Sequence, residues 1–517
     1  MGRFTEDVFD IREGGFWERR RKRRAGEKLL RTSRRNVQKT RRVDDGEGFP
    51  EAAWKNGGEN RPRSGRGTRI LSDAGVKVGG HTASTACPFL SGPSLGANGV
   101  MIGSDAHGGG PFSFDPWEAY RLGFITGMSM LVFGTVGTGK SSLVKSFAIR
   151  VVLAGRKLAV ASDLKGEWTG IIKALRGQVI QIGPGLGTKL NPLDPGVRPS
   201  RNRLGQPMTD DAWAMVVRTR RLQTMATLAM ILMDSSHLSP AEHASLEIAV
   251  DEAVAAAGRE GRTPTVVDVI DGLQHVDEEE LESAARLLGL TLRRITTGAM
   301  AGMFDGESTA DFSGDVPAVS IDTSAMRGAS KESRRIVSAC CGAWMEAMIT
   351  HSDGGQRVVV YEEGWDSLAS YADLSRMVEQ WKLARDYGIF NILILHKLKD
   401  LDMAGDQGSA MAAMAQSLLE DADVKVIYRQ DTSSLRQTSD RLELNDREIA
   451  LLRSLRKGRG LWKVGQLSFE VDNELTVEEV PLLDTDQRMD VGRDYGDEAG
   501  EPEVDEAGAP LPEWLAA

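Results

Sequence analysis

The segment Met130–Val144, with the sequence MLVFGTVGTGKSSLV, constrains the fold of this chain more than any other stretch. It begins with an apolar run, Met130–Phe133, that predicts a buried parallel strand. The glycines of GTVGTG then allow a tight loop whose backbone N–H groups turn inward, and a helix is predicted from Lys140 onward. The pattern G-x-x-x-x-G-K-[ST] is complete between Gly134 and Ser141, in the strand–loop–helix context of a phosphate-binding loop.

We expect this loop to bind ATP together with Mg²⁺. The loop amides and the helix N-terminus would hold the phosphates, and the Lys140 ammonium would reach the β- and γ-phosphates. The Ser141 hydroxyl would ligate Mg²⁺. A glycine-rich turn that binds nothing is the alternative, which the flanking strand and helix disfavour. The predicted nucleotide-binding residues are Gly134, Thr135, Val136, Gly137, Thr138, Gly139, Lys140, Ser141 and Ser142.

Length and composition narrow the class of protein. The 517 residues and 41% hydrophobic content suit a globular protein with material for several domains. The 3 cysteines, Cys87, Cys340 and Cys341, show neither metal-ligand spacing nor a plausible disulfide, so we expect a reduced, cytoplasmic setting. We expect no signal peptide, and no apolar run approaches the roughly 18 residues of a membrane span.

The net charge of −10 conceals a strong asymmetry between the two ends of the chain. Residues 1–42 are basic, with the runs WERRRKRR and TSRRNVQKTRR, whereas the chain beyond Val471 is acidic. Runs of like charge usually indicate solvated, disordered tails. Because Phe16 and Trp17 precede the arginines as anchors, the basic segment could instead dock on a membrane or partner, or contact nucleic acid.

Strand-like and helical patterns alternate along most of the remaining chain. Ser239 and Glu242 form a capping-box pattern within a run of four or so helices, and a hairpin pattern spans 460–472. Strands apolar on both faces and separated by helices predict an α/β fold with a mainly parallel, doubly wound sheet. The predicted strands of this sheet are 130–133, 158–163, 178–182, 316–322, 357–365, 389–396 and 424–428. Short apolar pieces at 99–105 and 111–117 are predicted to form a small β-element that leads into the first of these strands.

These patterns divide the chain into five regions. The predicted regions are a basic, largely disordered N-terminal region at 1–85, the first part of the ATPase domain at 86–207, an all-α insertion at 208–300, the second part of the ATPase domain at 301–475, and an acidic, disordered tail at 476–517.

Hydrolysis requires a carboxylate near Mg²⁺ and a group that positions or deprotonates water. The run VVVYEE supplies two carboxylates, Glu362 and Glu363, at the C-terminal end of a predicted strand, where ligands bind in such sheets. We expect Glu362 to hold Mg²⁺ through water and Glu363 to act as the general base. The alternative is that the two residues only cap the next helix.

Further candidate residues follow neighbouring strands. His396 ends the run ILILH, where a polar side chain can sense the γ-phosphate, unless it is merely a hydrogen-bonded loop residue. Arg385 and Arg429 are candidates for an arginine finger that acts on a neighbouring subunit, and a surface position is the alternative for each. The polar residues of SDLKGEW either approach the nucleotide or a subunit boundary, or form a turn and a helix cap; they are Asp163, Lys165 and Glu167.

The motifs GTVGTGKSSLVK, DLKGEW, LNPLD, VVVYEEGW and ARDYG followed by LILHKLKDL occur in one order. Together they resemble the VirB-type ATPases that energise type IV secretion and conjugation, within the FtsK/HerA superfamily of hexameric motors. The histidine that ends the sensor strand and the segment GLWKVG are similar to conjugation-associated ATP-binding proteins of actinobacteria. The resemblance covers about residues 95–475, and the helical insertion contributes little to it.

This resemblance implies a RecA-like P-loop NTPase fold and Mg²⁺-dependent ATP hydrolysis. It also implies a homo-oligomer, such as a hexamer, that works with membrane-embedded channel proteins at the inner face of the cell membrane. The chain departs from the pattern at Glu362, where such motors usually carry Asp. The region before residue 95 is also too short and polar for the N-terminal domain of the longer conjugation ATPases. Docking would then fall to a separate protein or to the basic segment.

Two other functions remain open. The first is a DNA-pumping translocase or coupling protein of the same superfamily, with DNA as a direct partner. Neither a built-in membrane span nor a winged-helix DNA reader is evident in the sequence, which counts against it. The second is a structural component that holds ATP and hydrolyses it negligibly, for which Glu362 in place of Asp is the only support.

Overall fold

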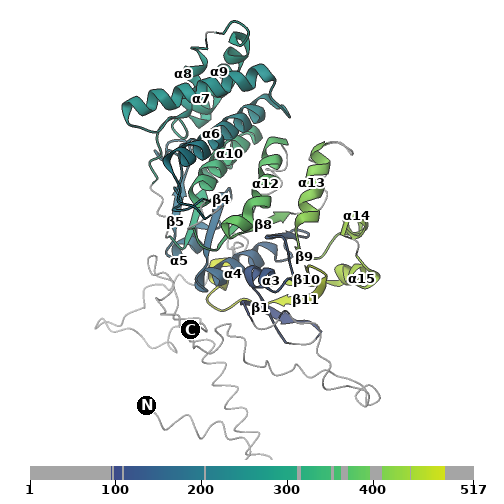
Figure 1. The fold of residues 1–517 in the computed structure, drawn as a ribbon. Coiled ribbons are helices and arrows are strands. Elements are labelled where there is room, and N and C mark those ends of the chain that lie inside the picture. Colours follow the sequence, from purple (N-terminus) through teal and green to yellow (C-terminus); the bar gives the residue numbers. More distant parts are fainter. Residues whose placement is uncertain are drawn as a thin grey trace, which may run out of the picture. The chain divides into compact units, whose positions relative to one another are not determined.

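The computed structural model describes residues 95, 98–107, 110–202, 205–276, 278–310, 316–350, 354–362, 371–395, 410–442 and 444–483. Within them, eleven strands form one sheet in the order β2-β1-β11-β10-β9-β3-β8-β7-β4-β6-β5 (Figure 1). The strands are β1 (Val100–Asp105), β2 (Pro111–Phe114), β3 (Ser129–Phe133), β4 (Lys157–Asp163), β5 (Gln178–Gln181), β6 (Ala318–Asp322), β7 (Arg357–Tyr361), β8 (Ile389–Leu395), β9 (Val424–Ile427), β10 (Arg459–Val464) and β11 (Leu467–Asn473).

The sheet has a parallel and an antiparallel part. From β9 to β5 every neighbouring pair is parallel, whereas β10, β11, β1 and β2 continue the sheet as antiparallel strands. The central strands β3 and β8 are completely buried, as expected for parallel strands covered by helices on both faces. Phe133 pairs with Leu395 of β8 and Ile427 of β9, so the C-terminal ends of these strands form one edge.

Helices connect the strands and cover the sheet. They are α3 (Pro116–Arg121), α4 (Lys140–Leu153), α5 (Thr169–Ala174), α6 (Asp210–Met233), α7 (Pro240–Glu260), α8 (Val266–Leu273), α9 (Glu282–Thr296), α10 (Lys331–Ile349), α12 (Tyr371–Leu383), α13 (Ala410–Asp421), α14 (Thr432–Leu442), α15 (Asp446–Ser454) and α16 (Val480–Leu483). Short 3₁₀ turns lie at η1 (Gly298–Met300), η2 (Ser324–Met326) and η3 (Ala384–Tyr387).

The two faces of the sheet carry different helices. Leu131 and Leu393 belong to a hydrophobic cluster with Leu374 of α12 and Leu418 of α13, and Tyr361 packs against the same cluster. Because successive strand residues point to opposite faces, the residue after Tyr361 is directed to the other face, where α4 lies. Figure 1 shows α12 and α13 on one side of the central strands and α4 on the other.

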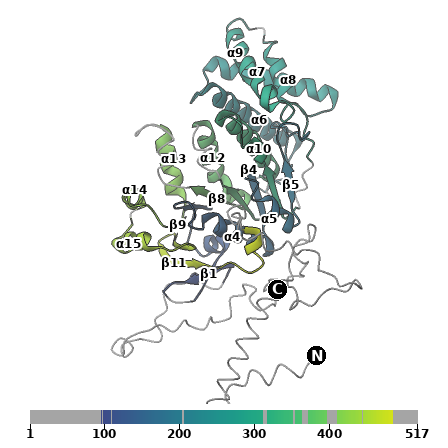
Figure 2. The same cartoon turned by 180° about the vertical axis from the view of Figure 1, so that it is seen from behind.

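Helices α6 to α9 are inserted between β5 and β6 in the sequence. They contact one another, and α6 also packs on α10, as both views show (Figure 2). Ser239 caps α7 through the predicted capping box: its hydroxyl accepts the Glu242 N–H, and the Glu242 carboxylate accepts the Ser239 N–H over 2.7 Å. None of the helices in the described ranges has the length and hydrophobicity needed to cross a bilayer.

The predicted α/β fold with a mainly parallel sheet is confirmed. The hairpin predicted at 460–472 is present as β10 and β11. The strands predicted at 99–105 and 111–117 are also present, but β1 pairs with β11 instead of leading into β3. Helices α14 and α15 were not predicted from the sequence. The five-region division, including the tails at 1–85 and 476–517, remains a prediction.

Candidate nucleotide-binding site

The phosphate loop lies between β3 and α4, at the C-terminal edge of the parallel strands. A Cβ atom at Gly134 would lie 2.5 Å from Cβ of Tyr428, so only glycine fits where the loop leaves β3 beside β9. Gly137 and Gly139 have φ angles of 78° and 106°, which strongly favour glycine. The sequence therefore supplies glycine at each position where the loop backbone demands it.

The N-terminus of α4 is open to an anion. Gly139 is the N-cap residue of α4, and no side chain caps the helix within the described structure. The Thr138 hydroxyl instead donates to the Thr135 carbonyl over 2.7 Å, within the loop. The amide groups of the first helical turn thus face the loop, where phosphate oxygens can accept their hydrogen bonds.

The Lys140 side chain folds back onto the phosphate loop. Its ammonium donates to the carbonyl oxygens of Gly134 and Thr135, at 2.6 and 2.9 Å. The side chain is buried although it carries a charge. Because an ammonium group prefers an anionic acceptor to a neutral carbonyl, phosphate oxygens would compete well for the same protons.

Two segments on the side of β3 that faces β9, away from β8, support the loop. The Thr135 N–H donates to the Arg429 carbonyl over 3.1 Å, just beyond β9. The Gly458 N–H donates to the Thr138 carbonyl over 2.9 Å, at the turn before β10. The phosphate loop is therefore held by backbone bonds to β9 and to the antiparallel part of the sheet.

Glu362 follows β7 directly, with β8 between it and β3. Its side chain is directed to the α4 face, where its Oε2 accepts the indole N–H of Trp168. The Lys145 ammonium of α4 lies 3.8 Å from Glu362 Oε1 and also donates to the Glu167 carboxylate. Burial raises the pKa of the Glu362 carboxyl, and the positive charge of Lys145 opposes that rise.

The groups at the start of α4 and the end of β7 fit a Mg²⁺ ion bound with a nucleotide. Ser141 and Lys145 are four residues apart and share one face of α4, about 6 Å apart along the helix axis. Lys145, which pairs with Glu362, thus follows Ser141 by about one helical turn. Glu362 Oε1 is buried and has no hydrogen-bond donor among the described residues. A hydroxyl and a carboxylate oxygen are suitable hard ligands for Mg²⁺, directly or through water.

The segment after β4 contributes to this arrangement. The Asp163 carboxylate accepts the backbone N–H groups of Glu167 and Trp168, at 3.2 and 2.8 Å. Burial raises the pKa of Asp163, and these two N–H groups oppose the rise. Asp163 thus closes the turn after β4, in line with one of the sequence-based alternatives, whereas Glu167 accepts from Lys145.

The remaining predicted residues are placed differently. Arg429 has an exposed side chain and a backbone carbonyl bonded to the phosphate loop. Arg385 is exposed in η3, which precedes β8 and therefore lies at the opposite edge of the parallel strands. Glu363 and His396 lie outside the described residues. The roles assigned to all four remain predictions.

Lys145, Trp168 and Gly458 were not among the site residues predicted from the sequence. The spacing of Lys145 from Ser141 was a usable signal, because residues four apart share a helix face. Trp168 was visible only as part of the DLKGEW segment, and its contact with Glu362 depends on β4 and β7 being neighbours. Nothing local in the sequence connects Gly458 with Thr138, which are far apart in the chain.

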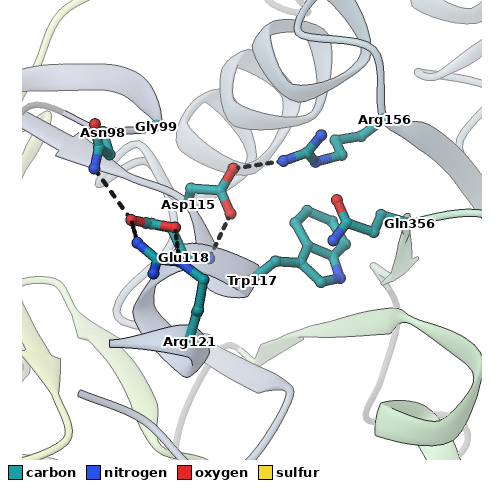
Figure 3. Close-up of a pocket in the computed structure, with 8 residues that line it drawn as sticks. All are labelled: Asn98, Gly99, Asp115, Trp117, Glu118, Arg121, Arg156 and Gln356. Atoms are coloured by element: carbon teal, nitrogen blue, oxygen red, sulfur yellow. Dashed lines mark hydrogen bonds and ion pairs between the residues drawn. The ribbon is translucent and has the colours of Figure 1, made fainter. Parts of the chain in front are cut away.

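A separate cavity of about 460 Å³ lies at the opposite edge of the sheet (Figure 3). Arg156 precedes β4 and Gln356 precedes β7, so the cavity is at the N-terminal ends of the parallel strands. Residues of its lining interact with one another: Arg156 donates to the Asp115 carboxylate over 3.1 Å and lies over the Trp117 ring. This position separates the cavity from the phosphate loop.

Comparison with solved structures places this fold among known proteins. The structure of VirB4 of Thermoanaerobacter pseudethanolicus matches with a TM-score of 0.61 and 22% sequence identity, over 75% of this chain and 100% of that chain. The plasmid coupling protein TrwB in complex with ADP and Mg²⁺ matches with a TM-score of 0.45 and 16% identity, over 68% of this chain and 85% of that chain. No protein-family model matches the chain, and no curated protein matches it. The chain therefore has the fold of the VirB4 structure, which confirms the sequence resemblance at the level of the fold.

Proposed function

We propose that this chain is an ATP-hydrolysing motor of a type IV secretion or conjugation apparatus. The observation that carries the proposal is the position of the phosphate loop, with its uncapped helix N-terminus, beside a buried carboxylate. Glu362 is joined to α4 through Lys145, one turn after Ser141. The fold shared with VirB4 and the order of the sequence motifs support the assignment to secretion or conjugation.

In this proposal the residues of the loop bind and orient the triphosphate. The amide groups at the start of α4 donate to the phosphates, and the Lys140 ammonium exchanges its carbonyl partners for phosphate oxygens. Ser141 and Glu362 would hold Mg²⁺, which neutralises charge on the phosphate oxygens when bound. Glu363 would take the proton of the attacking water, and His396 would sense the γ-phosphate.

A steady-state ATPase assay tests the proposal. We expect wild-type protein to hydrolyse ATP and the Glu363→Gln variant to lose at least about 10²-fold in rate, because the amide cannot accept the proton. Glu379→Gln serves as the matched control, since Glu379 is an exposed residue of α12. Wild-type activity at background, with and without DNA or membranes, would favour the nucleotide-binding structural component instead.

The Lys140→Ala variant tests the binding site independently of the chemistry. We expect it to lose nucleotide binding, because the phosphate-facing charge is removed. Lys173→Ala, on an exposed position of α5, is the matched control. Unchanged ATP affinity in Lys140→Ala would refute the site assignment.

The proposed setting is the inner face of the cell membrane, where the chain would act as an oligomer with channel proteins. The basic runs in residues 1–42 support recruitment to an anionic surface or a partner. Deleting residues 1–65 should weaken recruitment while sparing hydrolysis, and sizing with and without an ATP analogue should reveal assembly. A rate that rises with single- or double-stranded DNA would favour the DNA-pumping alternative.

A further inference from the structure

Lys145 is a buried lysine between two carboxylates. Its side chain is only 2% exposed, and its ammonium donates to Glu167 Oε2 while Glu362 Oε1 lies at 3.8 Å. Burying an ammonium group is costly, and pairing with one carboxylate would suffice to offset much of that cost. The second carboxylate is the one assigned to Mg²⁺ in the proposed function, which makes the position of Lys145 relevant to the site.

Trp168 reaches the same carboxylate from the segment after β4. Its ring is fully buried, and its indole N–H donates to Glu362 Oε2. Its backbone N–H is fixed by Asp163 at 2.8 Å, and the Lys145 ammonium lies 5.8 Å from the ring centroid. Trp168 is therefore held on three sides, so the hydrogen bond that it gives to Glu362 has a fixed direction.

The two oxygens of the Glu362 carboxylate therefore have different neighbours. Oε2 is occupied by the indole N–H, whereas Oε1 has no hydrogen-bond donor in the described part of the chain and faces the Lys145 side of α4. Side chains that orient a metal ligand in this way commonly affect metal affinity by about 10- to 100-fold when they are removed.

We propose that Lys145 and Trp168 are positioning residues for Glu362, which hold its carboxylate so that Oε1 is directed toward the first turn of α4, where Mg²⁺ would be held. This inference rests on the proposed function of the site. It assigns a role to the DLKGEW segment, which carries both Glu167 and Trp168: the segment secures the acidic end of β7 against the helix that follows the phosphate loop.

The test measures binding of a fluorescent ADP analogue to the full chain over a range of Mg²⁺ concentrations. In Lys145→Met we expect unchanged affinity without Mg²⁺ and at least about a tenfold higher Mg²⁺ midpoint. Trp168→Phe should shift the midpoint in the same direction by a smaller factor. Lys145→Arg, which keeps the charge, should have a Mg²⁺ midpoint close to that of wild type. Lys173→Met should have the same Mg²⁺ midpoint as wild type.

The outcomes separate the two proposals. A wild-type protein that binds no nucleotide refutes the proposed function itself. A wild-type protein that binds nucleotide, with a Mg²⁺ midpoint that is the same in Lys145→Met, overturns the positioning role. A purely structural role for Lys145 would lower the melting temperature and leave the midpoint in place, which also overturns it. If Lys145→Met does not fold, an unchanged midpoint in Trp168→Phe overturns the inference.

Discussion

The backbone N–H of Gly458 donates to the carbonyl oxygen of Thr138 over 2.9 Å, so the turn before β10 rests on the phosphate loop. The two residues belong to segments that are distant in sequence. Gly139 also lies close to this turn, since a Cβ atom added to Gly139 would be 3.3 Å from Gly458 Cα. The antiparallel part of the sheet therefore supports the nucleotide site and does not merely extend the fold.

Replacing Gly458 by alanine should weaken nucleotide binding. Gly458 has a φ angle of 82°, and a Cβ atom there meets nothing within 4 Å, so the substitution acts through backbone strain of about 1–2 kcal/mol. Gly261→Ala is the matched control, because Gly261 has a φ angle of 71°, is equally unobstructed and ends α7. Both variants should lose similar stability in thermal melts. Only Gly458→Ala should lose nucleotide affinity, and equal affinities would contradict the supporting role of the turn.

Gly134→Ala should damage the loop by a different mechanism. The added Cβ would lie 2.5 Å from Tyr428 Cβ, so the end of β9 must move away from β3. We expect a loss of about 1–3 kcal/mol in the free energy of unfolding, as for other overpacked sites, together with weaker nucleotide binding. Gly170→Ala, in α5 with no neighbour within 4 Å of its Cβ, should be neutral or slightly stabilising. Chemical denaturation of both variants makes the comparison, and a Gly134→Ala protein as stable as wild type would refute the close packing.

The sequence predicts the parallel part of the fold well, and the reasons are local. Apolar runs such as Leu131–Phe133 are buried on both faces, so hydrophobicity alone identifies them, and the glycine pattern locates the turn into α4. The phosphate loop is predictable for the same reason, since its geometry depends on consecutive residues. Local pattern also identifies the hairpin of β10 and β11, because the hairpin closes within a few residues.

Other features depend on which strands become neighbours, which no local pattern encodes. Pairing of β1 with β11 joins segments separated by most of the chain, so the sequence could not place the antiparallel strands in the same sheet. The contact between Trp168 and Glu362 likewise requires β4 beside β7. The pair of carboxylates was recognised as a candidate from its strand. The spacing of Lys145 from Ser141 marks a shared helix face, but only the fold shows that Lys145 faces Glu362.

Asp472 should make stability depend on pH in the acid range. Burial disfavours its charge, but hydrogen bonds and ion pairs with Arg459 and Arg456 outweigh that effect and lower the pKa of its carboxyl. Because the folded-state pKa lies below the unfolded one, the stabilisation is complete above the ordinary aspartate pKa near 4 and is lost as the pH falls through the lowered value. Asp472→Asn should therefore cost about 1–2 kcal/mol at pH 7 and progressively less below about pH 4.

Urea denaturation of wild type and Asp472→Asn at several pH values measures this effect. Asp386→Asn is the matched control, since Asp386 is exposed and has no ion pair among the described residues. A stability difference for Asp472→Asn that stays constant between pH 7 and pH 3 would contradict the assignment. Arg459, the ion-pair partner of Asp472, is the neighbour of Gly458 in the turn that supports the phosphate loop. Asp472→Asn should therefore also bind nucleotide more weakly than wild type at pH 7, where the wild-type ion pair is intact.

The two candidate arginines should differ in which subunit they serve. The carbonyl of Arg429 accepts the N–H of Thr135 in the same chain, so its Cα is fixed next to its own phosphate loop. Arg385 lies in η3, at the other end of β8 from that edge. A side chain at that distance can reach a nucleotide only in a neighbouring copy, through a head-to-tail interface. We therefore expect Arg385, and not Arg429, to act as an arginine finger in trans.

Mixing inactive variants decides between the two arginines. Arg385→Ala should lower the ATPase rate by roughly 10³-fold or more, as loss of a trans-acting arginine does. When it is mixed with an equal amount of Lys140→Ala, interfaces form that combine an intact phosphate loop with an intact Arg385. Random head-to-tail assembly then restores about a quarter of the wild-type activity. The same mixture made with Arg429→Ala should restore nothing beyond its own residual rate, because a residue acting in cis must share a chain with an intact Lys140. Restoration with Arg429→Ala, or none with Arg385→Ala, would reverse the assignment.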